Sequence, residues 1–205
     1  MSILRTLLAS LLVLAAGLSV LAAATDGFRA FTSETARRID VREHPRVLPQ
    51  VPLQTAGRTT IDFADLRGRW LLVDFIYTRC TTYCSVQGSE FARLQDRLAT
   101  PIATGKVVLL SISFDPEHDG PEQLAAYQQR SGSRGVGWIA ARPISPAARN
   151  ALMQAFGVTV IDDGLGGYEH NAAIGVVDPA GRLVAIMDWD APGDAARYVL
   201  QGLAR

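Results

Sequence analysis

Two nearly continuous runs of apolar residues constrain the fold of this 205-residue chain more than any other feature. Residues 70–77 read WLLVDFIY, and residues 107–114 read VVLLSISF. Runs of this length that are rich in β-forming residues are typical of strands buried on both faces. We therefore expect these two segments to form central strands of a sheet.

Helical stretches alternate with these runs. Residues 86–98 repeat apolar side chains at the spacing of one helix face, and further helices are expected over residues 121–131, 146–156 and 192–203. Ser145 is a good N-cap for the second of these three helices, and Gly157 is a good stop signal. Alternation of strands and helices indicates an α/β fold in which helices flank a central sheet.

The end of the chain predicts an antiparallel pair of strands. Residues 172–177 and 183–187 flank the segment Asp-Pro-Ala-Gly at 178–181, where Pro in the second place and Gly in the fourth favour a tight turn. This hairpin makes the expected sheet mixed rather than purely parallel. Residues 138–140 are expected to form a short edge strand, and residues 162–167 (DDGLGG) are expected to form a loop.

The first 24 residues differ from the rest of the chain. Arg5 is their only charge, and the 18 residues from Leu7 to Ala24 contain nothing more polar than serine. Such an N-terminal apolar helix can cross a bilayer, although it is short for a span. The three alanines at 22–24 also fit a signal-peptidase site.

We therefore expect residues 1–24 to be a membrane anchor or a signal peptide. The apolar run is longer than the roughly 7–15 residues of a usual signal core, which favours the anchor. Both alternatives place the remainder of the chain on the exported side of a membrane, since Arg5 would stay cytoplasmic. Cysteines on that side meet oxidising conditions.

Residues 25–56 are predicted to be a tether between the leader and a domain over residues 57–205. The segment holds three prolines, mixed charges and little periodicity, which is typical of an extended, semi-rigid linker. The remaining length suits a single domain.

Composition argues against two classes of protein. The chain has 20 basic and 20 acidic residues, so its formal net charge is zero, and no basic tract is present. Nucleic-acid binding depends on the neutralisation of many phosphates, so we expect no nucleic-acid partner. Two cysteines and three scattered histidines also give no spacing for a zinc finger.

Cys80 and Cys84 lie where a predicted strand meets a predicted helix. The start of a helix favours the thiolate over the thiol, and residues four apart lie on one helix face. Two such thiolates can cycle between dithiol and disulfide, or they can bind a soft metal ion. The alternatives are two inert thiols or a static disulfide, which would close too short a loop to add much stability.

His170 lies in a glycine-rich segment that enters the sheet, where functional sites are often built. With the two cysteines it would complete a Cys₂His set, which suits copper and is also compatible with zinc. A lone histidine in a polar loop can equally be a plain surface residue. His118 is expected to face solvent, and His44 has no evident partner.

Three segments resemble the Sco/SenC family. Residues 74–84 (DFIYTRCTTYC) resemble the family's cysteine signature, and residues 111–122 (SISFDPEHDGPE) resemble its D-P-x-x-D segment. Residues 168–170 (YEH), followed by the turn at 178–181, resemble the family's metal-binding histidine and the hairpin after it. The similarity covers about residues 50–203, with the motifs in the same order.

The resemblance implies a thioredoxin-like copper-binding domain over residues 57–205. The implied copper ligands are Cys80, Cys84 and His170, and Asp119 matches an acid that would support the ligands indirectly. The family faces the bacterial periplasm or the mitochondrial intermembrane space, usually anchored in the membrane. Here the expected location is the periplasm, with the N-terminal helix in the inner membrane.

The chain departs from the family pattern at three positions. Thr81 and Ser85 stand where members often have proline after each cysteine, and Asn171 stands where serine or threonine often follows the histidine. These differences concern the redox balance and the target more than the fold.

The resemblance implies a role in assembling the copper centre of cytochrome c oxidase. The first hypothesis is a metallochaperone that delivers copper to the copper-site subunit of a respiratory oxidase or to another copper protein. The second is a thiol–disulfide oxidoreductase in which Cys80 and Cys84 are the catalytic redox pair and His170 is dispensable. A peroxidase and a copper sensor or buffer are further alternatives, so the sequence leaves open whether the chain is an enzyme.

Overall fold

The computed structural model describes residues 2–80 and 83–205, with the side chains of all of these except residues 2 and 83–86. Its centre is an eight-stranded sheet with strand order β1-β10-β9-β4-β5-β6-β2-β3. The strands are β1 (Arg46–Val47), β2 (Leu53–Thr55), β3 (Thr60–Ile61), β4 (Trp70–Ile76), β5 (Val107–Ser113), β6 (Trp138–Pro143), β9 (Ala173–Val177) and β10 (Arg182–Asp188). The β4–β5 and β5–β6 pairs are parallel and the other pairs are antiparallel, so the prediction of a mixed sheet is confirmed.

The two apolar runs form the centre of this sheet, as predicted. Strand β4 lies between β9 and β5, and every residue of β5 is buried. Side chains alternate between the two faces of a strand, so Val73 and Phe75 of β4 pack in one core cluster while Leu72 and Ile76 pack in the other. Helices therefore cover both faces.

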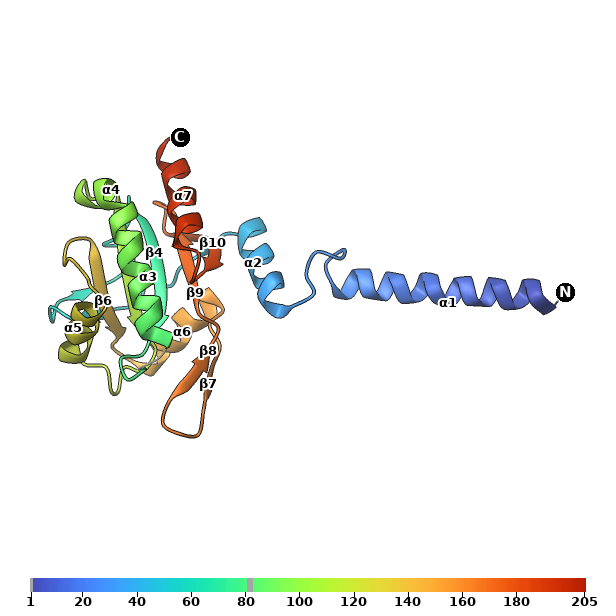
Figure 1. Cartoon of the computed structure of the whole chain (residues 1–205), viewed down its shortest axis with the longest axis horizontal. Helices are drawn as coiled ribbons and strands as arrows, with labels where there is room; N and C mark the ends of the chain where they lie inside the picture. Colours follow the sequence, from blue (N-terminus) through green and yellow to red (C-terminus); the bar gives the residue numbers. More distant parts are fainter. Residues whose placement is uncertain (1, 81–82) are drawn as a thin grey trace.

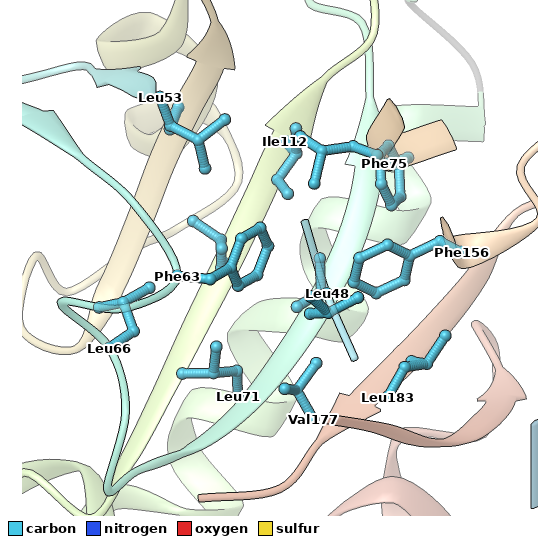
Figure 2. Close-up of a cluster of buried hydrophobic side chains, with 14 of the residues drawn as sticks. Leu48, Leu53, Phe63, Leu66, Leu71, Phe75, Ile112, Phe156, Val177 and Leu183 are labelled. Carbon is cyan, nitrogen blue, oxygen red and sulfur yellow. The ribbon is translucent and has the colours of Figure 1, made fainter. Parts of the chain in front are cut away.

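Six helices of the described chain form one layer on each face: α2 (Ser33–Glu43), α3 (Tyr83–Arg97), α4 (Ala99–Ala103), α5 (Pro121–Arg130), α6 (Pro146–Phe156) and α7 (Pro192–Leu203). Helix α1 (Ser2–Ala24) belongs to neither layer. Side chains of α2 and α6 join the first cluster, in which Phe156 of α6 lies over the sheet close to Phe63 (Figure 2). Helices α3, α4, α5 and α7 supply the second cluster, on the opposite face.

The capping residues in the sequence predicted the two ends of α6 correctly. The Ser145 hydroxyl accepts a hydrogen bond from the Ala148 amide at 3.1 Å, which confirms it as the N-cap of α6. Gly157 ends α6 with a φ of +66°, a conformation that favours glycine. Helix α3 begins at Tyr83, three residues before its predicted start, so Cys84 lies in its first turn.

The prediction of a tether over residues 25–56 is wrong for much of that segment. Helix α2 contacts β10, β1 pairs with β10, and β2 pairs with both β3 and β6. Leu48 and Leu53 are buried in the first core cluster. These strands are only two or three residues long, so they show no periodicity that a sequence pattern could reveal, and the sheet gives them their hydrogen bonds.

One further prediction was wrong. Strand β6 is not an edge strand, because the β2–β3 hairpin pairs along its outer side. The expected loop at 162–167 is confirmed over residues 163–167, where it forms the tip of a second hairpin, made by β7 (Val160–Asp162) and β8 (Tyr168–His170). This hairpin extends away from the central sheet (Figure 1).

Helix α1 extends away from the domain (Figure 1). Its segment Ile3–Ala24 has a mean hydropathy of 2.4, carries a single charge and is not buried by the rest of the chain. It is the one helix of the described residues that is long and apolar enough to cross a membrane, and a signal sequence has the same properties.

Candidate functional site

The first predicted site residue, Cys80, lies at the C-terminal end of the central sheet, four residues beyond β4. It is half-buried, and its amide donates a hydrogen bond to the Tyr77 carbonyl at 3.4 Å. Cys84 is the second residue of α3. The amide dipoles at a helix N-terminus stabilise negative charge, so this position favours a thiolate. The side chain of Cys84 lies outside the described residues.

Asp119 holds the segment that leads to Cys80. It is fully buried, and its carboxylate accepts hydrogen bonds from the Thr78 amide at 2.9 Å and the Thr78 hydroxyl at 2.5 Å. The Ser113 hydroxyl donates a third bond at 2.6 Å. The expected supporting acid therefore fixes the backbone two residues before Cys80, and its charge is satisfied by three donors.

An ion pair also holds this segment, on its solvent-exposed side. The Arg79 guanidinium donates to the Asp115 carboxylate at 2.8 Å, and Asp115 also contacts the His118 ring at 2.8 Å. The His118 side chain is 52% exposed, as predicted for a solvent-facing residue. His44 is also exposed and lies 3.3 Å from Asp40, so it does have a partner.

His170 ends strand β8 and is packed among aromatic side chains. Its ring meets Phe114 edge to face at a centroid distance of 5.1 Å, and Phe114 lies 5.6 Å from Tyr168. Burial lowers the pKa of His170 to about 4, because a charged ring would lose its hydration. The ring is therefore neutral at pH 7, and its buried Nδ1 has no hydrogen-bond partner among the described residues.

Cys80 and His170 line the same pocket. The cavity has a volume of about 510 Å³, and its lining residues are Tyr77, Cys80, Gln87, Asp163, Tyr168, Glu169, His170, Ala172 and Trp189. The hairpin β7–β8 supplies one wall, and the segment between β4 and α3 supplies another. No group of three His, Cys, Asp or Glu residues able to hold a metal is found among the described side chains, a set that does not include Cys84.

Sequence patterns missed several of these lining residues. Gln87 lies one helical turn after Cys84, so its spacing from the cysteine was an available signal. Trp189 follows β10 and carries no local signal, because only the return of β10 beside β9 brings it to the pocket. Tyr77 reads as the last residue of an apolar run, yet its hydroxyl lies 3.4 Å from the Tyr168 carbonyl.

Asp74 is a buried acid behind the pocket. It lies on β4, and its Oδ2 accepts a hydrogen bond from the Gln87 amide at 3.2 Å, while Oδ1 has no partner among the described residues. Burial raises the pKa of Asp74 to about 7, although hydrogen bonds with Ser111 and Gln87 oppose the rise. Gln87 therefore connects this carboxyl to the wall of the pocket.

The fold and the site define a class of protein. A mixed sheet with helices on both faces carries a cysteine between its central strand and the following helix, which is a thioredoxin-like arrangement. A model of the SCO1/SenC family matches residues 42–204, and the chain belongs to this family. The matched range begins before β1, in agreement with the place of β1 and β2 in the sheet.

Individual relatives share this fold at low sequence identity. A Stutzerimonas stutzeri protein named as copper-binding is 28% identical over 184 residues, which are 89% of this chain and 88% of the relative. Bradyrhizobium japonicum ScoI, solved with copper bound, has a TM-score of 0.64 and 22% identity over 76% of this chain and 98% of its own. BsSco, described as a cytochrome c oxidase assembly protein with a disulfide switch, has a TM-score of 0.68 and 21% identity over 77% and 94%.

Proposed function

We propose that this chain binds copper through Cys80, Cys84 and His170 and delivers it to another exported protein. The observation that supports the proposal most strongly is that Cys80 and His170, far apart in the sequence, line one pocket. Cys84 follows Cys80 by four residues at the start of α3. Copper is the cargo of this site.

The donor atoms suit copper. Thiolates select Cu(I), and an imidazole is an acceptable ligand for both Cu(I) and Cu(II). His170 is neutral, so its ring needs no deprotonation before it binds a metal. The buried Nδ1 has no partner among the described side chains, which is a further sign that the ring is arranged to bind a ligand.

The proposed recipient is the copper-site subunit of cytochrome c oxidase. Its support is the family itself, since BsSco is described as one of a family of oxidase assembly proteins. Copper would pass by stepwise exchange, with ligands of the recipient replacing those of this chain one at a time. The half-buried position of Cys80 leaves it accessible for such an exchange.

We propose the periplasm as the location, with α1 in the bacterial inner membrane. The apolar length of Ile3–Ala24 and the charge at Arg5 support this orientation. Membrane fractions washed at alkaline pH would retain an anchored chain, whereas a cleaved signal peptide would release the domain with a new N-terminus near residue 25.

Copper stoichiometry tests the proposal. The full chain in detergent is reduced, loaded with Cu(I) and dialysed against a competing chelator, beside Cys80→Ser, Cys84→Ser and His170→Ala. We expect one retained copper per chain, and its loss in all three variants. His118→Ala is the matched control, because His118 is an exposed histidine outside the pocket, and it is expected to keep its copper. Failure of the unaltered chain to retain copper would overturn the proposal.

The second candidate is thiol–disulfide exchange with a target protein. The place of Cys84 at a helix N-terminus favours it, because the helix dipole stabilises the thiolate, which is the form that attacks a disulfide. The two thiols would become a disulfide as the target disulfide becomes two thiols, with two electrons and two protons passing to the target. His170→Ala separates the candidates, since oxidase assembly that survives in this variant favours thiol exchange over copper delivery.

A further inference from the structure

The tip of the β7–β8 hairpin exposes a leucine to solvent. Leu165 is 93% exposed, the highest value among the large hydrophobic side chains of the described residues. Ile161, on the same hairpin, is 61% exposed. Single exposed apolar residues are common. A binding role for Leu165 must therefore be argued from the order of its loop and from the part that its hairpin plays in the pocket.

The loop that carries Leu165 is held by its own hydrogen bonds. Asp163 Oδ1 accepts from the Leu165 amide at 2.7 Å and from the Gly167 amide at 2.8 Å. Asp162 Oδ1 accepts from the Gly164 amide at 2.6 Å. The bonds from the Leu165 and Gly167 amides lower the pKa of Asp163, which therefore stays ionised. A loop that is already ordered loses little conformational entropy when it binds a partner.

The same hairpin forms a wall of the site. Asp163, Tyr168, Glu169 and His170 all line the pocket that contains Cys80. The hairpin extends outward from the body of the domain (Figure 1). A protein that contacts Leu165 therefore lies against the same hairpin that supplies Asp163 and His170 to the pocket, where a ligand exchange with Cys80 would occur.

The charge of the hairpin indicates the chemistry of that protein. Residues 159–172 contain Asp162, Asp163 and Glu169 and no lysine or arginine, although the whole chain has a net charge of zero. None of the three acids forms an ion pair with a described residue. A complementary surface would carry lysine or arginine around an apolar depression.

We propose that the β7–β8 hairpin is the docking element for the copper acceptor. Leu165 enters an apolar depression on the acceptor, and basic residues around that depression face Asp162 and Glu169. This inference rests on the proposed function, and it adds the part of the chain that recognises the recipient and the chemistry of the recipient's surface.

Transfer kinetics test the docking proposal. The full chain in detergent is loaded with Cu(I) and mixed either with the metal-free copper-site domain of the oxidase from the same organism or with a small Cu(I) chelator. We expect Leu165→Ser to slow transfer to the protein about tenfold, the effect of an interface anchor, and to leave transfer to the chelator unchanged. Val136→Ser is the matched control, since Val136 is 67% exposed on a different loop and should change neither rate.

Salt dependence tests the charge of the acceptor's surface. Transfer to the protein should slow as salt is added, and the double variant D162N/E169Q should be slower at low salt and less sensitive to salt. Asparagine at 162 keeps an oxygen that can accept from the Gly164 amide, so the loop should stay ordered.

The outcomes distinguish the two proposals. If the unaltered chain delivers copper to the domain and Leu165→Ser does so equally fast, the docking proposal is wrong. It is also wrong if Leu165→Ser slows the chelator reaction to the same extent, because the effect would then lie in the copper site. If the unaltered chain holds copper and delivers none to the domain, oxidase delivery fails, and docking to that acceptor fails with it.

Discussion

Asp119 shows how one buried residue can prepare the site without touching a ligand. Its three hydrogen bonds join the end of β5 to the segment before Cys80. Burial of a carboxylate costs free energy unless hydrogen-bond donors surround it. The donors here would in turn lose their acceptor without the carboxylate. The family resemblance of its D-P-x-x-D segment implied a supporting role, but only the folded chain identifies Thr78 and Ser113 as its partners.

We predict that Asp119→Ala lowers the free energy of unfolding by about 2–3 kcal/mol, because buried donors lose their acceptor. Copper affinity should fall as well, since the backbone before Cys80 loses its anchor. Urea unfolding and chelator competition measure the two effects. Asp190→Ala, which removes an exposed acid near the pocket, is the control and should change stability little. An Asp119→Ala protein that is as stable as the parent would contradict this account.

Asp74 should make the stability of the protein depend on pH. The pKa of Asp74 is about 7 in the folded chain and near 3.8 when unfolded. Between these values the folded state keeps a proton that the unfolded chain releases, so the free energy of unfolding falls as pH rises through this window. Over two pH units of this window, the free energy of unfolding falls by about 2–3 kcal/mol.

Reduced, metal-free protein should therefore lose more stability between pH 5 and pH 8 than the Asp74→Asn variant does. Urea unfolding at the two pH values measures the loss of stability in each protein. Because each loss is taken within one protein, any packing cost of the Asp74→Asn substitution cancels. Equal losses in the two proteins would show that Asp74 does not titrate in this range.

At the scale of elements, the contact between α2 and the end of α6 joins the N-terminal segment to the domain. Arg37 of α2 donates to the carbonyls of Phe156 and Gly157 at 2.7 and 3.1 Å. A helix C-terminus leaves such carbonyls without partners. Asn171 also donates to the Gly157 carbonyl at 3.0 Å, so the same point anchors the residue after His170.

Gly157→Ala should destabilise the protein more than Gly105→Ala. Both glycines have φ near +70°, where a side chain costs about 1–2 kcal/mol. At Gly157 a Cβ would also lie 2.7 Å from Arg37 Cδ, whereas at Gly105 it would meet nothing within 4 Å. The difference, about 1 kcal/mol, reports the displaced Arg37 contact. Thermal unfolding measures it, and equal destabilisation would mean that Arg37 moves aside without cost.

At the scale of the whole molecule, the domain includes residues that sequence patterns assigned to a tether. Val41, Leu48 and Leu53 are 0–2% exposed in the first core cluster. Burial of each such side chain contributes about 1.5–3 kcal/mol, while the net stability of a domain is only about 5–15 kcal/mol.

A chain that starts at residue 57 should therefore fail to unfold cooperatively, whereas a chain that starts at residue 32 should fold. Circular dichroism during heating tests both. The longer chain is the control for loss of α1, which the domain does not bury. A stable domain over residues 57–205 that unfolds cooperatively would show that the fold does not depend on α2, β1 and β2.

The sequence alone determined the central strands, the limits of α6 and α7, the mixed sheet and the residue types of the candidate site. These features depend on periodicity, caps and turns within a few residues of one another, which a sequence displays directly. Only the tertiary structure decided that β1 and β2 join the sheet, that β6 is covered, and that His170 is neutral and shares a pocket with Cys80. Each of these depends on contacts between distant segments, because burial and strand pairing arise only when the whole chain has folded.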